Sequence, residues 1–242
     1  MNSDSQRKLG VLMVGAGEYN VGYVQTEHGA APDKPAGVVA LTLFDLRRRG
    51  LVGRIALADI NGTRMPAVRA GIQSKIGDVY QGLDTSLDCY PEDNVESDPE
   101  AVTKAIASMS PGDACIVFTP DNTHFQIAMA ALQAGLHVLV AKPLVKTLAE
   151  HQQLVQAAGA QGVVLAVEFH KRFDPMYSDA ACRAKALGPF SFFSAYMAQP
   201  KHQLDTFKRW AGIASDISFY LNSHHIDIHS WMVGRKAVPV SV

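Results

Sequence analysis

Five short apolar runs alternate with segments of helical character along this chain, and this alternation constrains its fold more than any other feature. Runs that are apolar throughout are typical of strands buried on both faces, as in a parallel sheet covered by helices. We therefore expect an α/β fold with a doubly wound parallel sheet. The strands are expected at residues 9–15, 53–60, 113–120, 137–143 and 163–170, and the helices between them at 35–50, 61–77, 98–110, 121–135 and 148–162.

The pattern changes after residue 170. Residues 188–199 alternate like a strand with one exposed face, residues 223–234 have helical character, and residues 236–242 begin a further strand. A strand needs partners to be stable. We therefore expect a doubly wound domain over residues 1–170 and an α+β domain with an antiparallel sheet over residues 171–242, the latter truncated at its C-terminus.

Composition excludes several classes of protein. A formal charge of −1 gives no general electrostatic reason to expect nucleic acid or an anionic membrane as a partner. No apolar run approaches the roughly 18 residues of a membrane-spanning helix, and the first run is shorter than the ~7–15 residues of a signal peptide. The three cysteines, Cys89, Cys115 and Cys182, form neither a disulfide framework nor a zinc pattern, which favours a reducing, cytoplasmic setting.

Gly15 and Gly17 directly follow the first strand, in the sequence VGAGEYNVG. In a Rossmann domain the first glycine permits a tight turn, and the second lets backbone N–H groups approach a pyrophosphate. The position that usually holds a third glycine holds Asn20. The motif predicts a Rossmann-type domain that binds a dinucleotide through Gly15, Gly17 and Asn20, and an ordinary glycine-rich turn remains the alternative.

The acidic residue that binds the adenosine ribose is expected some 20 residues after such a turn, at the end of the second strand. Asp59 has that setting but lies about twice as far along the chain, which indicates an insertion at residues 25–37. A carboxylate accepts hydrogen bonds from a ribose 2′-OH and repels a 2′-phosphate, so Asp59 favours NAD. The neighbouring Arg64 leaves NADP open.

The fourth apolar run ends in a lysine, in the sequence HVLVAKPL. Lysines are seldom buried without a partner. Lys142 therefore either reaches solvent from the end of its strand or presents its ammonium group to a ligand, and Pro143 restricts the backbone at this point.

Three segments in order, DACIVFTPDNTH, AGLHVLVAKPL and EFHKRFDP, resemble the glucose–fructose oxidoreductase/inositol dehydrogenase/MocA family. The resemblance runs from about Gly10 to Gly234 and is most specific over residues 113–175. It implies an NAD(P)-dependent oxidoreductase acting on sugars or cyclitols. It also implies a Rossmann domain followed by an α+β domain for substrate binding and oligomerisation. Family members usually extend well beyond this chain, which resembles one that lacks the later strands.

The resemblance also assigns site residues. Asp59 matches the adenosine-ribose residue, and Lys142 matches the family's Glu-Lys-Pro signature at the reacting end of the cofactor. His224 matches the catalytic histidine, three residues before Asp227. Residues matching the loop against the cofactor are Thr119, Pro120, Asn122 and His124, and those implied at the substrate are Lys142, His170, Arg172, His224 and His225.

Two positions depart from the family. The signature glutamate is replaced by Ala141, which removes a carboxylate that the resemblance places at the nicotinamide side. Four residues before the catalytic histidine, where the family often has aspartate, stands Tyr220. A tyrosine exchanges protons but carries no charge at pH 7, so we place Tyr220 in a supporting catalytic role.

His224 is expected to act as the base and Lys142 to stabilise the developing alkoxide. Glu168 and His170 alternate on one strand face that points either to the cofactor or to the surface. His225 and His229 stand at i,i+4 on one helix face, which suggests a metal. No third ligand has suitable spacing, so we predict no metal site and place the extra histidines at the sugar pocket or a subunit interface.

These features predict an NAD-dependent dehydrogenase, with NADP possible, for a sugar, sugar acid or cyclitol hydroxyl. A homo-oligomer is expected of a complete chain, with neither nucleic acid nor membrane as a partner. The alternatives are a dinucleotide-binding regulatory or sensor protein without turnover, and a truncated fragment with impaired function.

Overall fold

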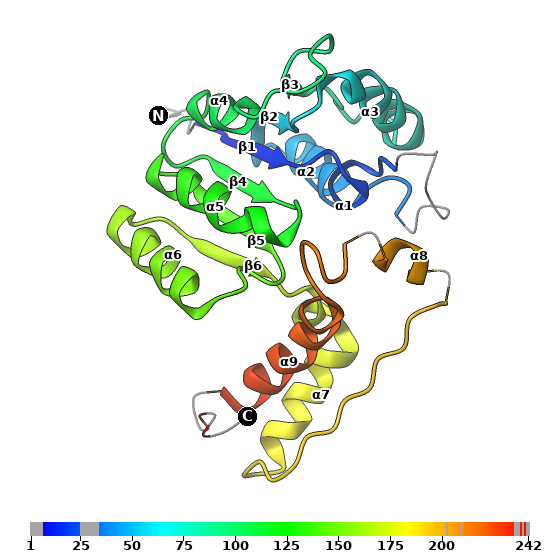
Figure 1. The fold of residues 1–242 in the computed structure, drawn as a ribbon. Coiled ribbons are helices and arrows are strands. Elements are labelled where there is room, and N and C mark those ends of the chain that lie inside the picture. The colour runs from blue at the N-terminus through cyan, green and yellow to red at the C-terminus, as the bar shows by residue number, and fades with distance from the viewer. Residues whose placement is uncertain are drawn as a thin grey trace, which may run out of the picture.

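A six-stranded parallel sheet forms the centre of the molecule (Figure 1). The structure, a computed structural model, describes residues 7–24, 34–201, 203–208, 210–234, 238 and 240. The strand order β3-β2-β1-β4-β5-β6 is that of a Rossmann domain, which confirms the predicted doubly wound parallel sheet. The strands are β1 (Leu9–Val14), β2 (Val52–Ala58), β3 (Asp88–Tyr90), β4 (Ala114–Val117), β5 (His137–Ala141) and β6 (Leu165–Glu168).

Helices cover both faces of this sheet (Figure 1). Apolar residues of α4, α5 and α6 pack in one cluster with the strands, and apolar residues of α2 and α3 pack in a second cluster. The helix bounds are α1 (Glu18–Val21), α2 (Val39–Arg48), α3 (Met65–Ile72), α4 (Ala101–Ala107), α5 (His124–Gln133) and α6 (Leu148–Gln161).

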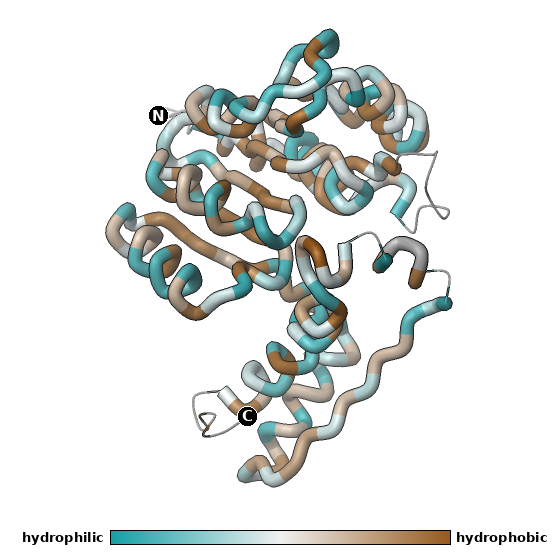
Figure 2. The backbone as a smooth tube through the Cα atoms, viewed as in Figure 1, coloured by the Kyte–Doolittle hydropathy of each residue, from teal (hydrophilic) through white to brown (hydrophobic). Residues whose placement is uncertain are grey.

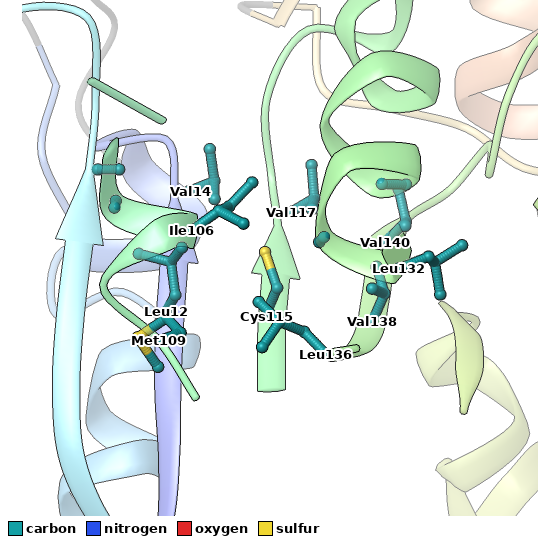
Figure 3. Packing of buried hydrophobic residues seen from close by; sticks show 14 of the residues in the cluster. Leu12, Val14, Ile106, Met109, Cys115, Val117, Leu132, Leu136, Val138 and Val140 are labelled. Carbon is teal, nitrogen blue, oxygen red and sulfur yellow. The ribbon is translucent and has the colours of Figure 1, made fainter. Parts of the chain in front are cut away.

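The two clusters follow from the alternation of side chains along each strand. In β1, Leu12 and Val14 belong to the cluster under α4–α6, whereas Val11 and Met13 belong to the other. Figure 3 shows the first cluster, in which Cys115 of β4 is a core residue as expected. The apolar strands thus lie between two layers of more polar helices (Figure 2).

The connection between β1 and β2 is divided into two helices, α1 and α2. Gly22 ends α1 in the left-handed conformation (φ 67°), and the N–H of Val38, just before α2, donates to the carbonyl of Tyr19 at 2.7 Å. This division explains the long spacing between Gly17 and Asp59. Most of the inferred insertion, residues 25–33, lies outside the described residues.

The C-terminal part of the chain, from residue 171 onward, departs from the expectation in several ways. Residues 188–199 run without a sheet partner among the described residues, so the predicted strand is wrong for the part of the chain that the structure describes. Their alternation fits a half-buried strand, but a strand forms only beside a partner. The helix at 223–234 is confirmed as α9 (Ser223–Val233), whereas β3, α7 (Pro175–Ala186) and α8 (Gln203–Phe207) were not predicted. Residues 236–242 lie largely outside the described residues.

Contacts from the 211–215 loop hold this part against the end of the sheet. The Lys146 ammonium group donates to the carbonyl of Ala214 at 2.9 Å, and the Ser215 hydroxyl donates to the carboxylate of Asp121. The α9 helix and the π-helical turn before it, Ser218–Asn222, consequently lie near the ends of β5 and β6. Among the described residues, no helix is both long and apolar enough to cross a membrane.

Candidate active site

Two cavities lie at the edge of the sheet where the parallel strands end, which is where ligands bind in such folds. The first, of about 470 Å³, is lined by the turn after β1, by Asp59 and by the loop after β4. The second, of about 310 Å³, is lined by Lys142, Glu168, His170, Tyr220 and His224, among others. Phe118 lines both, so the two cavities are neighbours along this edge.

The glycine turn has the geometry that the motif predicts. Gly15 has φ 98°, and a Cβ at this position would lie 2.3 Å from the carbonyl oxygen of Phe118, so only glycine fits. Gly17 has an ordinary φ of −87°, and a Cβ there would meet no protein atom within 4 Å. The space that a side chain on Gly17 would occupy is therefore part of the first cavity, and it leaves room for a ligand against the backbone.

Asn20 supports the turn from behind. Its side-chain amide donates to the carbonyl oxygens of Val14 at 2.9 Å and Gly15 at 2.6 Å, and the residue is fully buried. It lines neither cavity. Asn20 thus fixes the shape of the turn, a different role from the direct cofactor contact that the motif suggested.

The Asp59 carboxylate is held rigidly at the rim of the first cavity. Its Oδ2 accepts the N–H of Ala16 at 2.9 Å and its Oδ1 accepts the N–H of Asn61 at 3.1 Å. The Arg64 guanidinium lies 3.6 Å from Oδ1 and also lines the cavity. A carboxylate with remaining lone pairs beside the glycine turn fits the hydroxyl groups of a ribose.

Of the four residues predicted in the loop after β4, two line a cavity and two do not. Thr119 and Pro120 line the first cavity, whereas Asn122 is exposed and lines neither. His124 is fully buried, with Nδ1 at 2.9 Å from the carbonyl oxygen of Pro143 and Nε2 at 2.9 Å from that of Thr119. His124 therefore ties the loop to the end of β5 and does not face the cavity.

Lys142 lies inside the second cavity and does not extend into solvent. Its ammonium group donates to the carbonyl oxygen of Tyr220 and lies 3.8 Å from the centre of the same tyrosine ring. Burial lowers the pKa of Lys142 to about 8, against the opposing effect of the Asp121 and Glu168 carboxylates. The ammonium group is thus partly desolvated, which strengthens its interactions with a bound oxygen.

His224, in the first turn of α9, completes this cavity. The residue is 6% exposed, and its Nδ1 is buried without a hydrogen-bond partner among the described residues. Burial, followed by the positive charges of Lys142, His170 and Lys171, lowers the pKa of His224 to about 3. The ring is therefore neutral at pH 7, so one of its nitrogens carries a lone pair.

Two predicted substrate residues do not reach the cavities. Arg172 donates to both carboxylate oxygens of the buried Asp227, with Nε at 2.8 Å from Oδ2, and this ion pair fixes α9 to the segment after β6. Asp227 raises the pKa of Arg172, so the guanidinium stays charged. His225 is half-buried and lines neither cavity. Within the described ranges, no three residues among His, Cys, Asp and Glu gather into a group that could hold a metal ion.

Tyr19 and Phe118 are site residues that sequence reasoning missed. Their rings stack with centroids 5.4 Å apart, and the Lys34 ammonium group lies 4.6 Å from the centre of the Tyr19 ring. All three residues line the second cavity. The only sequence signal was an aromatic residue two positions after the second glycine of the turn.

Acid pH is expected to destabilise the fold through His224. The pKa of His224 is about 3 in the folded chain and about 6.5 in an unfolded one, so the unfolded chain binds more protons between these values. The contribution of the neutral His224 ring to the free energy of unfolding is fully present above pH 6.5 and is lost as the pH falls toward 3. We expect His224→Asn to reduce this pH dependence, as measured by urea unfolding at several pH values. The exposed His151→Asn serves as the control, and an equal reduction in that variant would contradict the assignment.

Residues 55–169 match the model of an oxidoreductase family with an NAD-binding Rossmann fold, GFO_IDH_MocA. The scyllo-inositol 2-dehydrogenase (NAD(+)) of Bacillus subtilis is 32% identical over 132 residues, which cover 53% of this chain and 37% of that protein. The scyllo-inositol 2-dehydrogenase (NADP(+)) IolW of the same organism is 30% identical over 160 residues, which cover 63% of this chain and 43% of IolW. Each alignment covers less than half the length of the curated relative.

Solved structures share the fold. The myo-inositol 2-dehydrogenase of Lactobacillus plantarum has a TM-score of 0.66 at 16% identity, and the match covers 94% of this chain and 57% of that one. The scyllo-inositol dehydrogenase of Lactobacillus casei, solved with NAD(H) and scyllo-inositol, has a TM-score of 0.65 at 17% identity and the same coverage. At 94% coverage of this chain, the likeness in fold extends beyond the sheet into the C-terminal part.

Proposed function

We propose that this chain belongs to the glucose–fructose oxidoreductase/inositol dehydrogenase/MocA family, whose model its residues 55–169 match, and that it carries the cofactor site and catalytic residues of an NAD(P)-dependent oxidoreductase. Its reaction would transfer a hydride between a sugar, sugar-acid or cyclitol hydroxyl and a nicotinamide. The observation that carries this proposal is the pair of neighbouring cavities at one sheet edge. One holds the glycine turn and Asp59, and the other holds Lys142 and His224.

The residues present fit a dinucleotide. The open space over Gly17 suits a pyrophosphate, and the fixed carboxylate of Asp59 suits the adenosine ribose. Phe118 lines both cavities, so a dinucleotide that binds its adenosine ribose at Asp59 and extends past Phe118 would present its nicotinamide end to the second cavity, beside Lys142. A nicotinamide bound there would supply the hydride acceptor.

In the oxidation of an alcohol, Lys142 and His224 would have separate roles. Because Nδ1 of His224 is buried, Nε2 is the nitrogen left to accept the hydroxyl proton. The Lys142 ammonium group would donate a hydrogen bond to the same oxygen and stabilise its developing negative charge. The backbone carbonyl and ring of Tyr220 orient that ammonium group, so the structure supports a positioning role for Tyr220.

Replacing Asp59 by asparagine is expected to reduce the preference for NAD over NADP by about tenfold, or ~1.4 kcal/mol. Asparagine keeps an oxygen for the Ala16 N–H but removes the charge that repels a 2′-phosphate, while Arg64 remains. Fluorescence titration of the variant with both dinucleotides measures the ratio of dissociation constants. Asp45→Asn, on the exposed face of α2, is the control, and an unchanged ratio in Asp59→Asn would contradict the assignment.

A regulatory or sensor protein without turnover is the second candidate. It is favoured by the contact of the Lys142 ammonium group with the Tyr220 carbonyl, which occupies one of its donors in this state. Ala141 also provides no carboxylate beside Lys142. Under this proposal the chain would bind dinucleotide as tightly as an enzyme and would not reduce it.

A screen for NADH and NADPH formation separates the two candidates. The purified chain is incubated with NAD or NADP and a panel of cyclitols, aldoses and sugar acids, and absorbance reports the reduced cofactor. Turnover that disappears in His224→Asn supports the oxidoreductase. Saturable dinucleotide binding with no turnover across the panel supports the sensor.

We also propose the cytoplasm as the location and a homo-oligomer as the assembly of the complete protein. All three cysteines are free, as expected in a reducing compartment. Apolar side chains of the segment 188–199, such as Phe192 and Tyr196, are exposed, and an oligomer would cover them.

A further inference from the structure

Glu168, at the end of β6, is a carboxylate in the second cavity to which the proposed reaction assigns no role. Its Cα is in register with that of Ala141, the residue before Lys142. Residues in register on adjacent parallel strands point to the same face of the sheet and start about 4.8 Å apart. The Glu168 side chain therefore begins one strand away from Ala141, on the same face, and both residues line the cavity with Lys142.

The Glu168 carboxylate also contacts His170. Nδ1 of His170 lies 3.1 Å from Oε1 and 3.3 Å from Oε2 of Glu168. An ionised carboxylate only accepts hydrogen bonds, so Nδ1 carries the hydrogen, and Nε2 is left as the acceptor in the neutral ring. The His170 ring in turn meets the His224 ring edge to face, with centroids 4.9 Å apart. Glu168, His170 and His224 thus form a continuous series of contacts.

The other groups around Lys142 are engaged or carry no negative charge. Asp121, the second carboxylate that lines the cavity, accepts the hydroxyl of Ser215. Tyr220 offers a carbonyl and a ring, and His224 is neutral at pH 7. Lys34 and Lys171 add positive charge to the same cavity. Glu168 and Asp121 are therefore the two negative charges that favour a protonated Lys142 there, against the effect of burial.

We propose that Glu168 is a positioning residue of this site, which holds His170 against the His224 ring and places a negative charge on the strand beside Lys142. The inference rests on the proposed function, because positioning matters only if Lys142 and His224 perform the reaction. No contact between Glu168 and the substrate is required. Glu168 ends β6 and Lys142 directly follows β5, so the carboxylate and the amine come from neighbouring strands.

Glu168→Gln tests the charge without removing the shape of the side chain. NMR titration of the Lys142 side chain and of the histidine rings gives a readout that does not depend on turnover. We expect the Lys142 midpoint to shift to lower pH, and the proportion of His170 protonated at Nδ1 to fall. With the substrate identified, kcat should fall about ten- to a hundredfold while KM for the dinucleotide stays within about twofold. Unchanged NMR titrations would overturn the proposal.

A second variant separates positioning from simple damage to the fold. In Ala141→Glu/Glu168→Gln the carboxylate returns to the neighbouring strand, at the position in register with residue 168. We expect the double variant to restore the Lys142 midpoint and at least part of kcat. A double variant that titrates like Glu168→Gln would contradict the role assigned to the charge. The NMR spectrum of the wild-type chain also reports which nitrogen of His170 is protonated. A His170 ring protonated chiefly at Nε2 would contradict the proposed contact with Glu168.

The failure of this inference is distinguishable from failure of the proposed function. Dinucleotide binding by the wild-type chain and by Glu168→Gln is measured separately, by calorimetry. If neither binds, the proposed function fails. If both bind with similar affinity and the Lys142 titration is the same in both, the proposed dinucleotide site stands and the role of Glu168 is wrong.

Discussion

Replacing Gly17 by alanine is expected to weaken dinucleotide binding about ten- to a hundredfold. A Cβ on Gly17 would meet no protein atom within 4 Å, but it would project into the first cavity, where a pyrophosphate would lie against the backbone. Forcing a methyl group into an occupied site typically costs about 1–3 kcal/mol. The fold should tolerate the change, because a φ of −87° suits alanine, and the melting temperature without ligand should change little.

The matched control is Gly71→Ala. Gly71 lies in α3, where an added Cβ also meets nothing within 4 Å, and it lines neither cavity. Both variants add one methyl group to open space, so calorimetric titration with NAD isolates the effect of location. Equal affinities in the two variants would mean that the glycine turn does not hold the cofactor.

Lys142→Met is expected to lower kcat about a hundred- to a thousandfold while dinucleotide affinity changes less than about threefold. Methionine keeps the unbranched apolar stem of lysine but removes the donor that would stabilise the alkoxide, and losses of this size follow removal of one such donor. Stability should change modestly, because the variant loses the bond to Tyr220 but no longer buries a charge. Steady-state kinetics with the substrate found in the screen measures both parameters.

Lys146→Met provides the control for this change. Lys146 lies four residues further along, also donates to a backbone carbonyl of the C-terminal part, and does not line the second cavity. A general loosening of the C-terminal part would affect both variants alike. Retention of full activity by Lys142→Met, or an equal loss in Lys146→Met, would remove Lys142 from the mechanism.

The sheet was predictable because its strands are buried on both faces and therefore apolar throughout. All five predicted strands are present, and β1, β4, β5 and β6 lie within the predicted ranges. The missed strand, β3, has only three residues, Asp88–Tyr90, one of them charged, so it lacks the apolar signal of the others. Residues 188–199 show the opposite case, since their alternation indicates a strand but pairing depends on a partner that the local sequence does not reveal.

The sequence predicts which residues line the cavities when they stand at the ends of strands. It predicts them less well when the outcome depends on the direction in which a side chain points. Lys142 and Asp59 stand at strand ends, which a parallel sheet brings to one edge. Asn20 and His124 carry polar groups that fit a cofactor equally well, but they instead bind backbone carbonyls behind the cavities. Arg172 is turned toward Asp227, 55 residues further along, a pairing that no local pattern encodes.

A crystal structure of this chain with NAD would test the central claim most directly. We predict the adenosine ribose at Asp59, the pyrophosphate over Gly17, and the nicotinamide ring in the cavity lined by Lys142, Glu168 and His224. Electron density for the dinucleotide at another surface, or a nicotinamide directed away from Lys142 and His224, would contradict the account.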